Sequence, residues 1–370
     1  MQSKKIILSL IAALAFTAGP ATASDVYSVD TFAIGTLING QFKVDSKEKA
    51  EACYKILNDE TRRLEYILSA YDPDSDVTRL NQHPGEWIQI EPETFEVLNG
   101  SKTIAALTHG TFDPTVGALV KLWSVDQPEH RVPSEAEIKR ALINVDYNLI
   151  DAKKENGRYF GKIGKKQSVA FGAIGKGYIA DKVINKLKQG GCGDSLVSLG
   201  GNVIGSGTNG SDKPWSIGLQ RPDKERGEYF AVVPLKDTSV VTSGDYEKFF
   251  IKDGVKYHHI LNPKTGKPVP ATLSSVTIID DNSAKAYKHL DALRYEPRSA
   301  LTDESDGLIA YRSILPQIKR KAPEVQVIAF EHGWNQGEAV RGIFEENGFK
   351  GASTFRDYGN NPRFTAWLKA

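Results

Sequence analysis

Strand-like and helix-like segments alternate irregularly along this sequence. Short alternating or apolar runs predict strands, whereas apolar residues at three- and four-residue spacing predict helices. The strand-like segments are 31–44, 196–199, 231–235 and 248–260, and the helix-like segments are 45–70 and 92–107. An Asp253-Gly254 turn predicts that the last strand-like segment is a hairpin. Because no regular strand–helix–strand repeat occurs, the pattern favours an α+β fold over a doubly wound sheet. Asp45-Ser46-Lys47-Glu48 resembles a capping box at the start of the first helix.

Composition narrows the possible functions. At 370 residues the chain is long enough for two domains or one large one, and 40% hydrophobic and 25% charged residues are typical of a globular protein. Lysine and arginine total 47 against 46 aspartates and glutamates, which gives a net charge of +1. Because proteins that bind nucleic acid usually show a basic excess, this balance argues against that class of partner.

The first 23 residues have the features of a cleavable signal peptide. Lys4 and Lys5 precede an apolar run from Ile6 to Phe16, and Ala21-Thr22-Ala23 offers the small residues that a signal peptidase accepts. The run is short for a membrane span, so the alternative is a buried N-terminal helix. We therefore expect a periplasmic protein whose mature chain has no stable membrane span. No cysteine follows the run, which argues against a lipoprotein anchor.

Cys53 and Cys192 are the only two cysteines. Export would permit a disulfide between them, but their separation in sequence says nothing about their proximity. Two unpaired buried thiols are therefore an equally open alternative. Neither cysteine has the spacing of a metal-binding or redox motif.

Two glycine-containing segments carry charged side chains. Phe171 to Tyr178 contains three glycines and Lys176, and residues at helical spacing follow it. A glycine turn that leads into a helix either binds an anion such as phosphate or is a plain tight turn. Phe112 to Gly117 places Asp113 before a proline, where the carboxylate either contacts a ligand or caps the next turn.

Two adjacent histidines, His258 and His259, lie in the predicted hairpin. Successive residues of a strand face opposite sides, so the pair is poorly placed to share one metal ion. We expect one of them to face a functional site and the other to be exposed.

Four motifs occur in the order and spacing of a known family. They are Tyr71-Asp72-Pro73-Asp74-Ser75-Asp76 with Leu80-Asn81, Phe112 to Gly117, Gly172 to Asp181 and Thr242 to Gly266. Together they resemble the ApbE family of FAD:protein FMN transferases over about residues 32–286. The resemblance implies an α+β fold of mixed or antiparallel sheets with flanking helices. It also implies Mg²⁺-dependent cleavage of FAD, with FMN passed to a Thr or Ser hydroxyl and AMP released, and acceptor flavoproteins that are subunits of membrane electron-transfer complexes.

The resemblance also assigns site residues by position. The residues that would lie along FAD are Ile34, Tyr71, Thr111, Phe112, Asp113, Lys176 and Ile260. Tyr71 offers a ring for stacking, and Lys176 offers a positive charge to phosphate. The Ala173 carbonyl falls at the position of a magnesium ligand. His259 would help to activate the acceptor hydroxyl or bind the cofactor, so His259 and Lys176 are the predicted catalytic residues.

The sequence departs from the family pattern at two places. Ala170 stands where most members have an aspartate. After the predicted strand 275–279, most members begin a helix with an Asp-Ala-Leu-Ser-Thr-like motif whose Asp and Thr bind magnesium. Here Asp291 is the candidate for that aspartate, and Tyr295 takes the place of the threonine. The alternative function is therefore an FAD-binding protein with impaired or no transferase activity, because magnesium needs several well-placed oxygen ligands.

The C-terminal part is a predicted fragment of residues 287–370, of which about 291–363 resemble the C-terminal end of release-factor glutamine methyltransferases. The methyl-donor glycine loop and the Asn-Pro-Pro-Tyr active-site motif of that family do not occur in the sequence, which argues against methyl transfer. We predict a strand over 325–331, a helix with Ala339 to Phe344 that Gly348 closes, and a strand over 351–358. Such a partial α/β tail, without its core strands, would expose apolar faces and strand edges, which favour disorder or association. The predicted organisation is a signal peptide (1–23), an ApbE-like domain (24–286) and this fragment.

Overall fold

The computed structural model describes residues 25–369 except 222–226, 246–247, 270–274, 281–282, 284–307, 333–335 and 357–361. These residues form helices and antiparallel sheets, which confirms the predicted α+β class. The predicted signal peptide and Asp291 lie outside the described residues. None of the helices in the described part of the chain combines the length and apolar character needed to cross a membrane.

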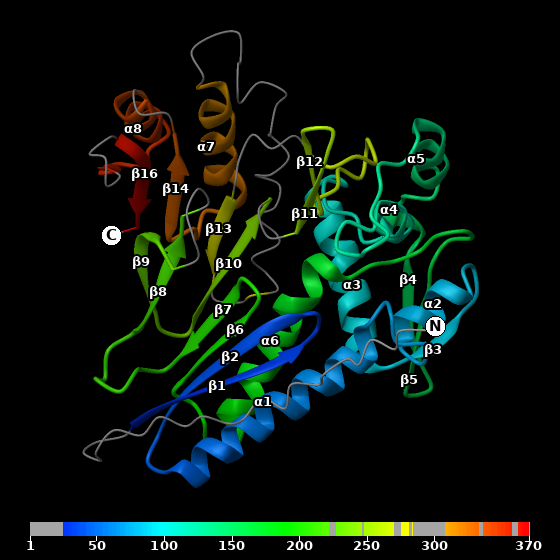
Figure 1. Cartoon of the computed structure of the whole chain (residues 1–370), viewed down its shortest axis with the longest axis horizontal. Helices are drawn as coiled ribbons and strands as arrows, with labels where there is room; N and C mark the ends of the chain where they lie inside the picture. The colour runs from blue at the N-terminus through cyan, green and yellow to red at the C-terminus, as the bar shows by residue number, and fades with distance from the viewer. Residues whose placement is uncertain are drawn as a thin grey trace, which may run out of the picture.

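A six-stranded antiparallel sheet runs through the centre of the molecule (Figure 1). Its strand order is β1-β2-β6-β7-β10-β13. The strands are β1 (Asp25–Ala33), β2 (Thr36–Val44), β6 (Ser195–Leu199), β7 (Asn202–Ser206), β10 (Thr238–Gly244) and β13 (Ser275–Asp280). Side chains alternate between the two faces of a strand, so this sheet can bury an apolar core on each side.

Two long helices, α1 (Lys47–Leu68) and α6 (Gly172–Gln189), pack against one face of this sheet. Phe42, Leu57 and Leu187 are fully buried in the core that the helices share with the sheet. Burying one such side chain contributes about 1.5–3 kcal/mol to folding. This core therefore fixes the two helices relative to the strands.

The opposite face of the sheet packs against the hairpin of β8 (Trp215–Gln220) and β9 (Tyr229–Leu235). Trp215, Leu235 and Val240 are buried there. The indole nitrogen of Trp215 donates a hydrogen bond of 2.9 Å to the Ser206 carbonyl, which satisfies its one polar group. The sheet thus separates two apolar cores.

A smaller antiparallel sheet lies on the right of Figure 1, in the order β3 (Ile88–Ile90), β5 (Arg158–Lys162), β4 (Asp151–Glu155). Helix α2 (Asp76–Gln82) precedes β3, and α3 (Pro92–Leu107) packs between this sheet and α6. The bounds of α3 match the predicted helix 92–107.

A third group of elements joins α4 (Gly117–Trp123) and α5 (Glu135–Leu142) to the hairpin of β11 (Phe249–Lys252) and β12 (Val255–His258). A 3-10 turn, Tyr147–Leu149, follows α5. The predicted hairpin turn is confirmed: Asp253 and Gly254 both have positive φ, 51° and 77°, as a two-residue hairpin turn requires.

The start of α1 differs from the predicted capping box. Ser46 is the N-cap, and its hydroxyl accepts a hydrogen bond of 3.2 Å from the N–H of Lys49. Because the helix begins at Lys47, the third helical residue is Lys49 and not Glu48, so no acidic side chain closes the reciprocal half of the box.

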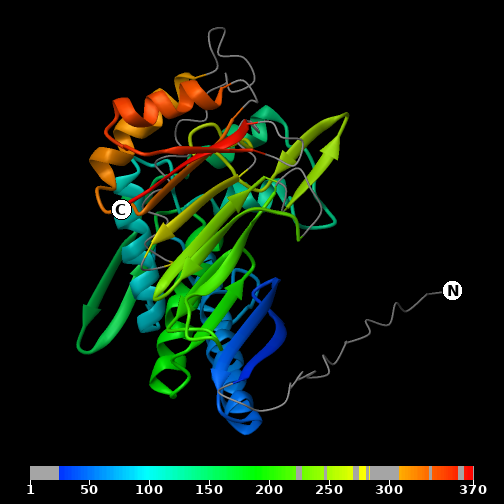
Figure 2. The same ribbon diagram turned by 90° about the vertical axis from the view of Figure 1, so that its left-hand side faces the viewer.

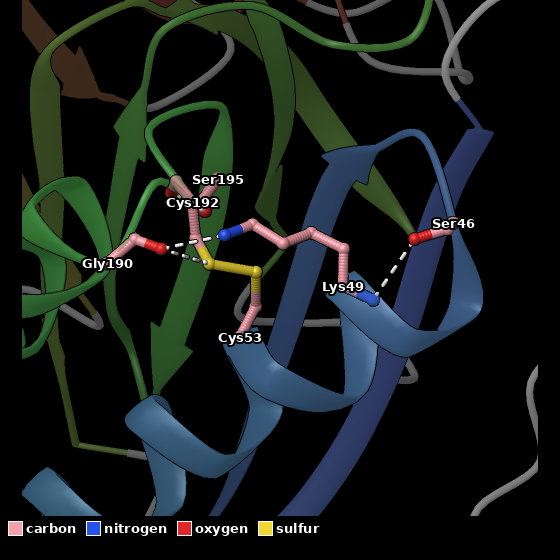
Figure 3. Close-up of a disulfide and its surroundings, with 6 residues drawn as sticks. All are labelled: Ser46, Lys49, Cys53, Gly190, Cys192 and Ser195. Atoms are coloured by element: carbon pink, nitrogen blue, oxygen red, sulfur yellow. Dashed lines mark hydrogen bonds between the residues drawn. A yellow bond between two sulfur atoms is a disulfide. The ribbon is translucent and has the colours of Figure 1, made fainter.

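The two cysteines form a disulfide between α1 and the turn after α6 (Figure 3). Cys53 and Cys192 are both buried, and their Cα atoms lie 5.9 Å apart. The ammonium of Lys49 donates to the Gly190 carbonyl beside the disulfide, at 2.9 Å. Of the two alternatives left open by the sequence, the structure has the disulfide.

The C-terminal residues form a compact unit with its own core. Its helices are α7 (Ile309–Lys321) and α8 (Gly337–Glu346), and its strands β14 (Val327–Glu331), β15 (Ser353–Arg356) and β16 (Pro362–Leu368) pair in the order β14-β16-β15. In Figures 1 and 2 this unit lies at the opposite end of the molecule from the start of α1.

The predicted strand, helix and closing Gly348 of this unit are confirmed, since Gly348 has a φ of 83° after α8. The prediction that its apolar faces stay uncovered is wrong. Leu315, Val340 and Phe344 are fully buried together, because the three strands pair with one another and the two helices supply the other side of the core.

Removing the disulfide should destabilise the protein. Cys53 and Cys192 are 139 residues apart, so the bond restricts a long loop of the unfolded chain. We expect the C53A/C192A variant to lose about 2–5 kcal/mol of unfolding free energy, measured by guanidinium titration. The wild type unfolded under a reductant should match the variant. An unchanged midpoint in both would contradict a stabilising disulfide.

Candidate functional site

Helix α6 begins without a side-chain cap. Its first internal hydrogen bonds run from the N–H groups of Ile174 and Gly175 to the Phe171 carbonyl, at 3.1 and 2.7 Å. The N–H groups of Gly172 and Ala173 are therefore not used by the helix itself, and the positive end of its dipole is here. The prediction of a glycine turn ahead of the helix is wrong, because these glycines lie inside its first two turns. The uncapped start nevertheless has the geometry of an anion-binding helix terminus.

Two of the sequence motifs hold the chain that enters α6. The Asn81 side chain bonds both main-chain groups of Val169, with its Nδ2 3.0 Å from the carbonyl and its Oδ1 2.7 Å from the N–H. The N–H of Gly117 donates to the Ser168 carbonyl at 2.9 Å. A Cβ atom at Gly117 would lie 2.6 Å from that carbonyl oxygen, so only glycine permits this approach. Asn81 and Gly117 thus hold the main chain of residues 168–169 in place just before α6.

The turn between β1 and β2 is held by two charged residues of α1. Ile34 has a φ of 48°, which is an outlier for a β-branched residue, and its N–H donates to Glu65 Oε1 at 2.6 Å. The Arg62 guanidinium donates to the Phe32 carbonyl at 2.6 Å and lies 3.3 Å from Glu65 Oε2. This ion pair therefore bonds the main chain at Phe32 and at Ile34, where β1 leads into the turn.

Lys176, from the second turn of α6, reaches the turn between β6 and β7. Its ammonium donates to the Gly200 carbonyl at 3.4 Å. Gly200 and Gly201 have φ values of 53° and 94°. A Cβ atom at Gly200 would lie 2.3 Å from the Thr36 hydroxyl of β2, so the two hairpin turns and Lys176 meet closely.

The adjacent histidines have different environments. His258 is 1% exposed, its Nε2 lies 2.7 Å from the Val269 carbonyl, and its Nδ1 accepts from the N–H of Ile260. Both ring nitrogens are thus used inside the protein. The prediction that one histidine faces a site while the other is exposed is therefore wrong: His258 is buried and structural, and the exposed histidine is His259, the one assigned to the site.

His259 lies close enough to Lys176 to respond to its charge. Loss of hydration, together with the smaller effect of the charges of Lys176 and Lys248, lowers the pKa of His259 to about 4, and a hydrogen bond with the Lys248 carbonyl acts in the opposite direction. That bond joins the carbonyl to Nδ1 at 3.2 Å, which leaves Nε2 as the unprotonated nitrogen of the neutral ring. Part of the residue remains exposed, so a ligand can reach it.

Tyr71 lies near the same group. Its side chain is 74% exposed, and it is hydrogen-bonded to Gln127 and within electrostatic reach of Asp126 and Lys248. Lys248 in turn pairs with Asp126 at 3.0 Å. The structure therefore brings the predicted residues Tyr71, Lys176 and His259 into one region, with Lys248 as a link.

Asp113 caps the turn that follows it. Its Oδ1 accepts from the N–H and hydroxyl of Thr115, at 2.8 and 2.6 Å, and its Oδ2 accepts from the N–H of Tyr147 at 3.1 Å. Burial raises the pKa of this carboxyl, and these hydrogen bonds oppose the rise. Of the two open interpretations, the cap has direct support. Its predicted neighbours along FAD also differ in exposure, since Phe112 is 7% exposed and Thr111 is half-buried.

The predicted magnesium ligands are only partly within the described residues. Ala173 lies in the first turn of α6, whereas Asp291 is outside the described range. Among the residues that the structure describes, no three His, Cys, Asp or Glu side chains gather in a way that could hold a metal ion. Magnesium prefers several oxygen ligands in octahedral geometry, and of the two predicted ligands only Ala173 lies within the described residues.

Sequence reasoning missed Arg62, Glu65 and Lys248. All three are charged residues on elements that the patterns predicted, and nothing in their spacing distinguishes them from ordinary surface charges. Ile260, by contrast, was predicted and follows His259 directly; it is half-buried, and its carbonyl accepts from the N–H of Val269 at 3.0 Å.

Comparisons with known proteins agree on one family. The model of the ApbE family matches residues 34–292. The FAD:protein FMN transferase of Treponema pallidum is 32% identical over 308 residues, which are 77% of this chain and 83% of the relative. The ApbE protein of Thermotoga maritima has a similar structure, with a TM-score of 0.67 and 31% identity over 78% of this chain and 92% of that one. The flavinyl transferase ApbE of Pseudomonas stutzeri, in its apo form, also has a TM-score of 0.67, with 25% identity over 85% of this chain and 94% of that one. A family match over most of the chain, together with these relatives, shows that the chain belongs to the ApbE family.

Proposed function

We propose that this protein is an exported FAD:protein FMN transferase. The observation that carries the proposal is the position of Lys176, near the uncapped start of α6 and within electrostatic reach of His259. Such a place offers main-chain N–H groups and a positive charge to a diphosphate and a neutral imidazole to a hydroxyl. The curated relatives are named for that reaction.

The proposed reaction is a phosphoryl-type transfer. The hydroxyl oxygen of an acceptor Thr or Ser attacks the phosphorus of the FMN half of FAD. The new oxygen–phosphorus bond forms as the bond to the AMP oxygen breaks, and AMP leaves with that electron pair. Lys176 would hold the diphosphate and offset its charge, since such reactions depend mostly on positioning and electrostatic stabilisation.

His259 would take the proton of the attacking hydroxyl. Its lowered pKa keeps the ring neutral at neutral pH, and the bond from Nδ1 to the Lys248 carbonyl leaves Nε2 as the acceptor. Ile34, Tyr71, Thr111, Phe112 and Ile260 would border the nucleotide, as the family resemblance implies. Asp113 would then shape the wall through its bonds to Thr115 and Tyr147.

Magnesium is the second requirement that the family resemblance implies. The described residues would offer it the Ala173 carbonyl, and Asp291 is the candidate carboxylate. We assign no step of the reaction to the ion, because of the two predicted ligands only Ala173 lies within the described residues.

The disulfide supports the proposal of export to the periplasm. Disulfides persist in oxidising compartments and are rare in the reducing cytosol. The Cys53–Cys192 bond is buried between α1 and the end of α6, where it joins two helices of the main core. We keep subunits of membrane electron-transfer complexes as the proposed acceptors.

The second candidate function is FAD binding without transfer. Ala170 and Tyr295 replace polar residues of the family pattern, and no described carboxylate cluster compensates for them. This candidate shares the nucleotide site with the first. The two differ only in whether FAD is cleaved.

Product release distinguishes the two functions. We expect the purified protein with FAD, MgCl₂ and an acceptor flavoprotein to release AMP, seen by chromatography, and to add FMN to the acceptor, seen by mass spectrometry. Excess EDTA should abolish both products if magnesium is required. FAD binding in calorimetry with neither product would leave only the binding protein. No heat of FAD binding would contradict both functions.

The neutral state of His259 can be measured directly. In an NMR titration of the imidazole nitrogens, the His259 signal should change with a midpoint at about pH 4, because burial and nearby lysines disfavour the proton. The ring is then neutral at pH 6–8 and gains its proton only as the pH falls through that midpoint. The H259Q variant identifies the signal by its absence. A midpoint near the ordinary value of 6.5 would contradict this environment.

The ion pair on α1 should set FAD affinity through the β1–β2 turn. E65Q weakens the acceptor that holds the N–H of Ile34 and breaks the pair with Arg62. A hydrogen bond to a charged group is worth about 1.5–3 kcal/mol, so we expect FAD to bind about tenfold more weakly in calorimetry. E51Q is the matched control, because Glu51 is an exposed carboxylate on the same helix, far from the turn. Equal affinities of the two variants would rule out this role.

A further inference from the structure

The small sheet β3-β5-β4 has one face that is buried and one that is not. Gly161 marks the buried face, because a Cβ atom there would lie 2.8 Å from Leu98 of α3. Residues opposite one another in an antiparallel pair share a face, and Phe160 pairs with both Lys153 and Gln89. These three residues therefore lie on the face that points away from α3. The hairpin of β4 and β5 forms a lateral edge of the molecule in Figure 2.

This outer face combines basic and aromatic side chains. We call Trp87, Lys153, Arg158, Phe160 and Lys162 the basic–aromatic face. The ammonium of Lys153 lies 4.8 Å from the ring centre of Trp87 and 5.7 Å from that of Phe160, and the ammonium of Lys162 lies 5.7 Å from Trp87. Trp87 remains 38% exposed and Arg158 is exposed.

Positive charge predominates in the segment that contains β4 and β5. The segment 151–166 contains six basic residues, Lys153, Lys154, Arg158, Lys162, Lys165 and Lys166, against the two acids Asp151 and Glu155. Its net charge is +4, although the whole chain has only +1, so the rest of the chain is negative. Asp151 lies opposite Lys162 and Glu155 opposite Arg158, so both acids share this face with its three basic residues, and Glu155 pairs with Lys153 at 2.8 Å. The face itself therefore keeps a net charge of +1, and the other positive charges of the segment lie beside it.

We propose that the basic–aromatic face binds the surface of a membrane that contains anionic phospholipids. Lysine and arginine near such a surface are attracted to the headgroups, and Trp and Phe rings favour the boundary between headgroups and acyl chains. Long lysine side chains can cover an aromatic ring while their charged ends meet phosphate. An exposed sheet face of this kind presents its charges and rings in one layer, as a lipid surface requires.

This binding is independent of the flavin chemistry. No residue of the basic–aromatic face belongs to the region of Lys176 and His259, and α3 packs between the small sheet and α6. The association would be peripheral, with the protein lying on the membrane and no helix crossing it. It would hold the protein where membrane-bound acceptor domains are found, if those are its partners.

Vesicle flotation tests the proposal on the full chain. We expect the protein to float with vesicles of 70% phosphatidylcholine and 30% phosphatidylglycerol at 50 mM NaCl and not with phosphatidylcholine alone. Each basic side chain near such a surface changes binding about fivefold, so K153Q/R158Q/K162Q should bind about 100-fold more weakly. W87S should weaken binding as well, and 500 mM NaCl should weaken binding of the wild type.

The matched control is K121Q/K139Q/K236Q, which removes the same charge from exposed lysines elsewhere on the chain. The control should keep wild-type binding, and circular dichroism should show that both triple variants are folded. Equal losses in the two triple variants, or equal binding to neutral and anionic vesicles, would overturn the proposal. Capture of the protein by immobilised polyglutamate without vesicle binding would also overturn it, in favour of an acidic polypeptide.

Discussion

The packing of α1 and α6 against one face of the central sheet determines where Arg62, Glu65 and Lys176 lie. Each helix uses one side for the core and another for the site. Leu57 and Leu64 of α1 are fully buried, whereas Glu65 on the same helix bonds the β1–β2 turn. On α6, Val183 and Leu187 are buried, and Lys176 reaches the β6–β7 turn. Core packing thus brings the β1–β2 turn within hydrogen-bonding distance of α1 and the β6–β7 turn within hydrogen-bonding distance of α6.

Much of the fold follows from local patterns, because periodicity identifies helices and strands directly. The bounds of α3 and the β11–β12 hairpin match their predictions. The covered core of the C-terminal unit is not predictable in this way. The pairing of β14 with β16 and of β16 with β15 depends on contacts that local patterns do not encode. The sequence places the glycines of 171–178 in a turn before the helix, whereas the structure places them inside the first turns of α6. Glycine is typical both of turns and of helix starts that other groups approach closely, so the pattern does not separate the two.

The candidate site was only partly predictable. Lys176, His259 and Tyr71 came from motif order, and the structure gathers them in one region. Motif order does not show which way a side chain points, so the ligand and cap interpretations of Asp113 could be separated only by its bonds to Thr115 and Tyr147. Glu65 and Arg62 were unpredictable, since their role depends on a turn that is about 30 residues earlier in the chain and adjacent only after folding.

The position of the disulfide has a topological consequence. Cys53 and Cys192 close a covalent ring that contains α2 to α6 and the small sheet. Most of the family motifs therefore lie within this ring. A single proteolytic nick anywhere between the two cysteines opens the ring without releasing a fragment. The two pieces stay tethered and can keep their native contacts until the Cys53–Cys192 disulfide is reduced.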